Sequence, residues 1–489
     1  MSAVVQAVSP AGLEPALTAA MAAFAVAAHD FPTLARQRAR DAIADCIGCI
    51  LAGSREPLAA PLAATLPGFD VASAAAPSLL IGAARYGAPA DAALYNGTLA
   101  HALDFDDTNH PAYAHPSAVL VPAMLAVASL APLSPLLAQS APQASGRALI
   151  DAYIVGFEFF GKLGRALNTQ HYKRGWHATG SFGALAAAAA AGRLLGLDAP
   201  RMMMALGIAA SSASGLRANF GSMTKPLHAG FAARNGVFAA LLARAGFTAS
   251  EQAIEHRYGY VNVFNSGIGY DPAPLMQMGD GLEILTEHGL ALKPYAACGA
   301  THPGIEAAEL LHAQIASRTN GTNGTNRTIR SVRMGVCSMA FEPLIHIMPA
   351  SPLEGKFSLH FCIAAALLYG KVSLATFSDE MVNDARIRAL IPAMQMEVDA
   401  RWKDDSEFAT EIQVELEDGS RLTEFIPLAQ GKPARWFSTE RLHAKFADCA
   451  GAVATANQVE PAWRALQELD TDEGCQRLLQ ALAPMRVQS

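Results

Sequence analysis

The feature that most constrains the fold is a change of pattern near residue 270. Before it, alanine-rich runs repeatedly end at glycine, as in "AAAAAAGRLLG", which stops at Gly196, and "FAARNGVFAALLARAG", which stops at Gly246. Glycine just after the last turn is a helix stop signal, because it adopts the left-handed backbone at low cost. The first 270 residues are therefore predicted to form helix after helix.

Alternating strand patterns follow. The segment 328–337, "TIRSVRMGVC", is rich in β-branched residues. The segment 411–427, "EIQVELEDGSRLTEFIP", places Asp418-Gly419 between two alternating runs, which is typical of a β-hairpin. Helical patterns lie between these strands and return after about residue 435.

These patterns predict a mainly α protein with two bodies. A large all-helical domain is expected over residues 1–272 and is completed by 436–489, while a smaller α+β domain, 273–435, is inserted into it. Hydrophobic residues make up 52% of the chain and charged residues only 16%, which is enough for a large core. Ligands often bind in the cleft between two such bodies.

Composition excludes several classes of function. The net charge of −7 offers no basic excess for phosphates, so no nucleic-acid partner is expected. The apolar stretch from Thr108 to Gly146 is interrupted by six prolines, so we expect buried helices rather than a membrane span. The N-terminus lacks the cationic start of a secretion signal, and the odd number of cysteines, seven, favours reduced thiols and a cytoplasmic protein. Cys46 and Cys49 form a C-x-x-C within an apolar run, which favours core packing.

Titratable residues gather in residues 101–117, "HALDFDDTNHPAYAHPS". If the preceding helix continued through "ALDFDD", His101, Asp104 and Thr108 would share one face and Asp106 would point elsewhere. Such a helix should end near Pro111, because residues before proline avoid the α conformation.

Four predicted helix starts each carry a side chain able to bear positive charge: His115 before Pro116, Lys225 before Pro226, His302 before Pro303, and His177 before the N-cap candidates Thr179 and Ser181. Helix N-termini bind anions, and a cationic side chain there strengthens a carboxylate site. The same location disfavours protonation of a histidine and leaves it a neutral base. Each residue alone is better explained as a structural cap. The four together, with the carboxylate of Asp104, support a binding site equally well, although spacing does not show that they converge.

Neither a metal nor an organic cofactor is expected. The candidate ligands are Asp104, Asp106, Asp107, His110 and His115. They match no H-E-x-x-H motif and no regular calcium loop. No glycine-rich loop fits a dinucleotide or a nucleoside triphosphate, and no G-x-S-x-G elbow occurs.

Four motifs, in order along the chain, carry a resemblance to a known family: "NGTLAHALDFDDTNHPAYAHPSAVLVPAMLA", "GWHATGSFGALAAAAAAGRLLGLD", "GSMTKPLHAGFAARNGVFAALLARAGFT" and "KPYAACGATHPGIEAAELL". They closely resemble the MmgE/PrpD family, which includes 2-methylcitrate dehydratase, cis-aconitate decarboxylase and iminodisuccinate epimerase. The resemblance implies an all-helical domain with an α+β lid, a homodimer, and an active site between the domains that needs no metal or cofactor.

The resemblance also implies site residues, which are Asp104, Thr108, His115, His177, Lys225 and His302. Two departures stand out. Phe361 occupies the place where the decarboxylase pattern has a tyrosine, which counts against cis-aconitate decarboxylation. The "DFDDT" and "HPSAV" segments depart from the 2-methylcitrate dehydratase pattern.

Family members move a proton at a carbon beside a carboxylate of a small polycarboxylate. His115 or His177 would be the base and the other the acid, with Asp104 orienting a histidine and Lys225 stabilising the enolate-like charge. Thr108 and His302 would contact substrate, His302 once the lid closes. Arg217 and Arg234 are candidates for a remote carboxylate, a surface or interface role being the alternative.

By a narrow margin these residues favour a cofactor-independent lyase that performs a dehydratase-type elimination on a di- or tricarboxylate. An epimerase, a decarboxylase and a non-catalytic carboxylate-binding protein remain open.

Overall fold

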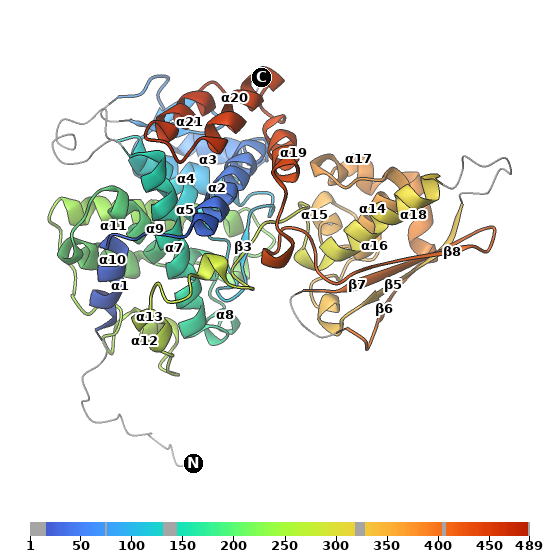
Figure 1. The fold of residues 1–489 in the computed structure, drawn as a ribbon, viewed down its shortest axis with the longest axis horizontal. Coiled ribbons are helices and arrows are strands. Elements are labelled where there is room, and N and C mark those ends of the chain that lie inside the picture. The colour runs from blue at the N-terminus through green and yellow to red at the C-terminus, as the bar shows by residue number, and fades with distance from the viewer. Residues whose placement is uncertain (1–15, 74–75, 131–143, 318–327, 403–406, 488–489) are drawn as a thin grey trace, which may run out of the picture.

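The computed structural model describes residues 16–73, 76–130, 144–317, 328–402 and 407–487. Within them the protein is mainly α, as predicted, with a small mixed sheet (Figure 1). None of the described helices combines the length and the apolar character that a membrane span requires.

The longer helices of the first 250 residues are α1 (Leu17–Val26), α2 (Thr33–Gly53), α4 (Pro89–Ala100), α5 (Ser117–Ala128), α7 (Gly146–Leu167), α9 (Ala178–Leu194), α10 (Ala199–Ser212) and α11 (Thr224–Arg244). Near the C-terminus follow α19 (Thr439–Ala450), α20 (Ala456–Gln467) and α21 (Gly474–Leu482). One hydrophobic cluster joins both groups, with members from Leu17 to Leu292 and from Phe437 to Met485. Figure 1 shows the red C-terminal helices beside the blue α2. Cys46 and Cys49 are free and buried within α2, in agreement with core packing.

Glycines set how closely the central helices approach. A Cβ atom on Gly97 of α4 would lie 2.9 Å from the Cα of Gly230 of α11, and a Cβ on Gly236 of α11 would lie 2.3 Å from the Cβ of Ala187 of α9. Only residues without a side chain fit such contacts, so α4 and α9 pack directly on α11. The predicted stop signals are confirmed, since Gly196 (φ 68°) and Gly246 (φ 94°) lie just beyond α9 and α11 in the left-handed conformation.

A second hydrophobic cluster contains residues from Tyr295 to Ile426. Its sheet has the order β6-β5-β7-β8, with β5 (Ile329–Val336), β6 (Met394–Val398), β7 (Thr410–Leu416) and β8 (Arg421–Ile426). β5 pairs parallel with β6 and antiparallel with β7, and Asp418-Gly419 (φ 82° at Gly419) turns β7 into β8, as the hairpin prediction required. Helices α14 (His302–Ser317) and α16 (Leu359–Tyr369) pack together beside this sheet.

A two-residue β ladder joins the segment between the two hydrophobic clusters to residues 101–117. β3 (Thr108–Asn109) pairs antiparallel with β4 (Leu290–Ala291), with Thr108 opposite Ala291. Lys293, two residues after β4, is thereby placed beside the titratable segment.

Candidate active site

The backbone of residues 101–107 departs from the predicted helix. α4 ends at Ala100, His101 is its C-cap, and Asp104 adopts the left-handed conformation with φ 53°. Thr108 belongs to β3. The expectation that His101, Asp104 and Thr108 share a helical face is therefore wrong.

The reason lies in three ammonium groups that bind three successive carbonyl oxygens: Lys356 Nζ donates to Leu103 O (3.0 Å), Lys293 Nζ to Asp104 O (2.7 Å) and Lys445 Nζ to Phe105 O (2.8 Å). Charge-assisted hydrogen bonds are roughly twice as strong as neutral ones, so they outweigh the helical bonds these carbonyls give up. Lys445 is anchored in turn by a buried ion pair with Asp45 of α2 (2.6 Å).

Asp104 lies between two ammonium groups, those of Lys225 and Lys293, in a cluster of charged and imidazole side chains. Lys225 Nζ is 3.0 Å from its Oδ1 and Lys293 Nζ is 3.2 Å from its Oδ2, while His115 Nε2 is 3.8 Å from Oδ1. Burial alone would raise the pKa of Asp104, but the neighbouring charges, that of Lys225 first, hold it well below its ordinary value. Two ammonium groups thus face one carboxylate, an arrangement that favours a further anion.

Four imidazoles lie around this ion group. The ring centroid of His101 is 4.3 Å from that of His115 and 5.9 Å from that of His177, and His177 Nδ1 is 3.0 Å from His228 Nδ1. Burial lowers the pKa of His101 to about 4, and burial followed by the charge of His101 lowers the pKa of His177 well below its usual value. His101 and His177 are therefore neutral near pH 7 and able to accept a proton.

Three of the four predicted helix starts converge here. His115 precedes α5, and its backbone N–H donates to Thr179 Oγ1 in the first turn of α9 (3.1 Å). His177 is itself the N-cap of α9, a place the sequence analysis gave to Thr179 or Ser181. Lys225 lies in the first turn of α11.

The structure gives the remaining predicted residues other surroundings. His302 begins α14, and its Nε2 donates to Ala297 O (3.0 Å). The guanidinium of Arg217 lies 3.8 Å from the ring centroid of Tyr172 and donates to the Tyr172 carbonyl (2.9 Å). Arg234 is exposed and lies nine residues after Lys225 on α11, which places it on the opposite face of that helix.

Comparison with known proteins identifies the family of the chain. The MmgE/PrpD N-terminal domain model matches residues 19–273 and the MmgE/PrpD C-terminal domain model matches residues 295–471. The chain belongs to the MmgE/PrpD family. It is 30% identical to cis-aconitate decarboxylase of Aspergillus terreus (strain NIH 2624 / FGSC A1156), covering 89% of each chain. It is 29% identical to cis-aconitate decarboxylase of Homo sapiens, covering 82% of this chain and 81% of that one.

Several ammonium and imidazole groups of the cluster in this MmgE/PrpD protein were not predicted from its sequence. Lys293 precedes Pro294, the same X-Pro pattern that drew attention to Lys225, and His228 lies three residues after Lys225 on one helix face. Both signals were therefore available. Lys356 follows the short helix α15 (Pro352–Gly355), among residues of the second hydrophobic cluster, and no local pattern indicates that it reaches Leu103.

Four side chains of the cluster have metal-ligand chemistry. One donor atom from each of His101, Asp104, Asp106 and His115 lies within 4.8 Å of the others. However, Asp104 already binds two ammonium groups, and Asp106 accepts from the His101 ring. A divalent ion would have to compete with these partners, so metal independence stays a prediction for this family member.

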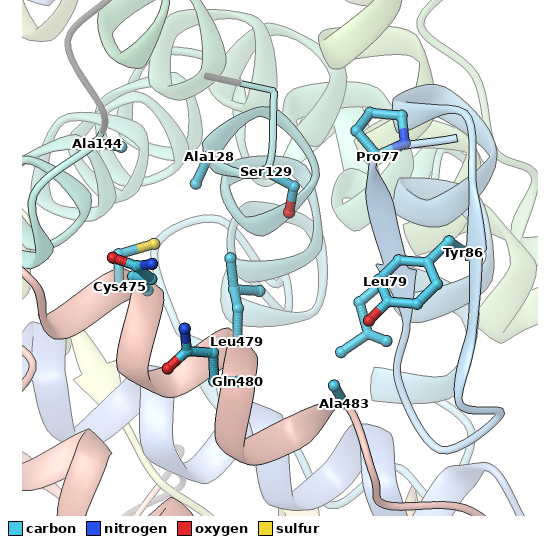
Figure 2. Close-up of a pocket in the computed structure, with 11 residues that line it drawn as sticks. Pro77, Leu79, Tyr86, Ala128, Ser129, Ala144, Cys475, Leu479, Gln480 and Ala483 are labelled. Carbon is cyan, nitrogen blue, oxygen red and sulfur yellow. The ribbon is translucent and has the colours of Figure 1, made fainter. Parts of the chain in front are cut away.

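A separate cavity of 330 Å³ lies beside α21 (Figure 2). Mostly apolar side chains line it, among them Leu79, Tyr86 and Leu479, and none of the described residues that line it is a carboxylate, lysine, arginine or histidine. Burial raises the pKa of Cys475, which also lines it, to about 12, so that thiol stays protonated. The cavity therefore offers no counterpart to the carboxylate chemistry of the family.

Proposed function

We propose that this protein is a lyase that acts on a small di- or tricarboxylate through an enolate-like carbanion beside a carboxylate. The observation that carries the proposal is the grouping of Lys225, Lys293 and Asp104 with the neutral imidazole of His177 and with His115. Membership of the family, whose matched relatives are named as decarboxylases of a tricarboxylate, supports the same substrate class.

The ammonium groups supply the electrostatic part of the mechanism. The helix starts at His115, His177 and Lys225 lie near the same place, and the positive end of each helix dipole favours an anion there. A substrate carboxylate bound by Lys225 and Lys293 would carry the developing negative charge in a setting where the donors are already oriented. Thr108 is a further proposed substrate contact, as the family resemblance implies.

The imidazoles supply the proton transfers. His115 or His177 takes a proton from, or gives one to, the carbon beside the carboxylate, and the other ring serves the opposite step. A histidine in such a role contributes about 10²- to 10⁴-fold to the rate. Asp104 balances charge and orients His115 and the two lysines.

The leaving group separates the candidate reactions. In decarboxylation the bond to a carboxylate breaks, its electron pair passes into the adjacent unsaturated acid, and a carbon is protonated. In dehydration a proton and a hydroxide leave. The names of the relatives favour decarboxylation of a cis-aconitate-like acid over the water elimination expected from the sequence.

Phe361 keeps dehydration as the second candidate. Its ring is fully buried in the second hydrophobic cluster, with its centroid 6.1 Å from that of Phe377. A phenylalanine cannot supply the phenol that the decarboxylase pattern has at this place.

We also propose roles for the second body of the protein and for its dimer. The body of residues 273–435 would act as a lid on the helical domain, and the functional unit would be a cytoplasmic homodimer. Exposed apolar side chains support an interface on the helical domain, where Phe247, Tyr258 and Val263 border a hollow of 710 Å³.

One experiment separates the reactions. Protein dialysed against a chelator is incubated in deuterated water with cis-aconitate and with citrate-like hydroxy acids, and products are followed by NMR. We expect retained activity after chelation, loss of carbon dioxide from cis-aconitate, and a deuterium atom in the product. New alkene signals from a hydroxy acid would favour dehydration, and exchange without net product would favour an epimerase. Tight binding with neither outcome would leave a carboxylate-binding protein and end the lyase proposal.

A further inference from the structure

Asp106 is a fully buried carboxylate shared by two imidazoles. His101 Nδ1 lies 3.0 Å from both of its oxygens, and His115 Nδ1 lies 3.3 Å from Oδ2. The sequence expectation that Asp106 points away from the other titratable groups is wrong. The left-handed residue Asp104 turns the chain, so that Asp106 returns to the ring at the end of α4.

The acceptors around these rings decide where the protons lie. A carbonyl oxygen only accepts, and His115 Nδ1 is 2.9 Å from Asp107 O, so this nitrogen carries the hydrogen. His101 Nδ1 faces a carboxylate whose pKa, despite burial, is held well below its ordinary value by His101 and His115. His101 Nδ1 therefore also carries the hydrogen. Each neutral ring then has its lone pair on Nε2.

His101 Nε2 stands out among the buried polar atoms. The ring is buried, and this nitrogen has no hydrogen-bond partner among the residues that the structure describes. Buried polar side-chain atoms are nearly always paired, so an unpaired lone pair beside the His115 and His177 rings calls for a function.

We propose that Asp106 is a positioning residue that fixes the tautomer of His101 and acts together with the Asp107 carbonyl on that of His115, so that both rings present Nε2 lone pairs to the proton-transfer cluster. Where the reaction breaks a substrate C–H bond, as dehydration does, its electron pair passes to the carboxylate-stabilised carbon and the proton bonds to Nε2 of His115. In decarboxylation the same Nε2, protonated beforehand, gives its proton to the carbon and keeps the N–H electron pair. The imidazolium, whose Nδ1–H donates to Asp107 O, is stabilised by the negative charge of Asp106, whose Oδ2 lies 3.3 Å from the same nitrogen. His101, held by the same carboxylate, is the second Nε2 base.

This inference rests on the proposed function for its chemistry, but the proton placement can be measured without a substrate. Nitrogen-15 NMR of histidine-labelled protein at pH 7.5 distinguishes Nδ1–H from Nε2–H rings, and His101→Gln and His115→Gln variants assign the two signals. We expect Nδ1–H in both rings. An Nε2–H tautomer in either ring of the unaltered protein would overturn the proposal, whether or not any polycarboxylate is turned over.

The variant Asp106→Asn tests the carboxylate, with Asp107→Asn as the matched control. Asp107 is equally buried, but its Oδ1 accepts from the Ser117 backbone N–H at the start of α5 (2.9 Å), and burial, then Asp106, raises its pKa well above the usual value. An amide is therefore a close substitute for the protonated Asp107 side chain.

For Asp106→Asn we expect altered tautomer signals and a kcat at least about tenfold lower, with KM changed less than threefold, because an amide can donate to a ring nitrogen and reverse the tautomer. Asp106→Glu, which restores a carboxylate, should recover part of the activity. Unchanged tautomers in Asp106→Asn, or an equal shift in Asp107→Asn, would refute the proposal. If Asp106→Asn does not fold, the test depends on the spectrum of the unaltered protein and on the kcat of His101→Gln. Nδ1–H rings together with a kcat lowered at least about tenfold support the proposal. A kcat within threefold of the unaltered protein counts against the proposal.

Discussion

The helix starts of α5, α9 and α11 differ from that of α14, although their sequences look alike. The first three place His115 and Lys225 beside Asp104, and His177 beside His101. At the fourth start, His302 donates its Nε2 hydrogen to Ala297 O within its own segment. A cation-capable residue next to an X-Pro step thus marks a helix start, and the packing of that helix decides whether it also marks a site.

Packing explains the difference. α4, α5, α9 and α11 belong to one bundle in which glycines permit close contact, so their ends meet. α14 packs on α16 and on the sheet of the second hydrophobic cluster. His302 is connected to the site chiefly by the charge of Lys293, which follows burial among the causes that lower the pKa of His302 to about 3.

The sharpest test of this comparison pairs two histidines. We expect His177→Ala to lower kcat at least about a hundredfold with little loss of stability, because it removes a neutral ring from the proton-transfer cluster. Steady-state kinetics on the substrate identified by NMR, with thermal unfolding as the check on folding, measures this. Turnover within threefold of the unaltered protein would remove His177 from the mechanism.

The matched variant His302→Ala should lower kcat less than tenfold, because its hydrogen bond serves the local backbone at the start of α14. An equal loss in the two variants would show that the α14 start belongs to the site, as the family resemblance implied, and would break the distinction drawn from packing.

A smaller effect is expected within α11, where two cationic residues lie on opposite faces. Lys225→Ala should reduce kcat/KM about ten- to a hundredfold, less than the loss of a ring, because Lys293 still binds Asp104. Arg234→Ala should leave kcat/KM within twofold, since its side chain is exposed on the far face. A large loss in the Arg234 variant would instead support the remote-carboxylate role considered for it.

Local signals in the sequence predicted much of the fold. Helix stops at Gly196 and Gly246, the strand 329–336 and the Asp418-Gly419 hairpin depend on neighbouring residues, and each is present. The residues Asp104, His115, His177 and Lys225 were also identified, and the structure brings them together.

The predictions that failed concern residues held by distant partners. α4 stops at Ala100 because three distant lysines bind the carbonyl oxygens of residues 103–105. These are Lys445 of α19, Lys293 after β4 and Lys356 after α15. Helical periodicity contains no information on such contacts. A prediction based on it therefore put Thr108 on the helical face of His101 and pointed Asp106 away from that face. A local pattern predicts an element, whereas the end of that element here depends on charges far away in the chain.

The smallest effect we predict concerns pH and involves two buried histidines, His101 at the end of α4 and His302 at the start of α14. Burial lowers the pKa of His101 to about 4 and that of His302 to about 3, so the folded protein keeps these rings neutral while the unfolded chain takes up protons below about pH 6.5. Their contribution to the free energy of unfolding is complete above pH 6.5 and decreases as the pH falls toward 4. Denaturant unfolding at pH 7 and pH 5.5 should show this loss. His302→Gln should reduce the loss by about 1 kcal/mol, and the surface variant Arg234→Ala should not change it. A loss in His302→Gln equal to that of the unaltered protein would mean that this ring does not stay neutral in the fold.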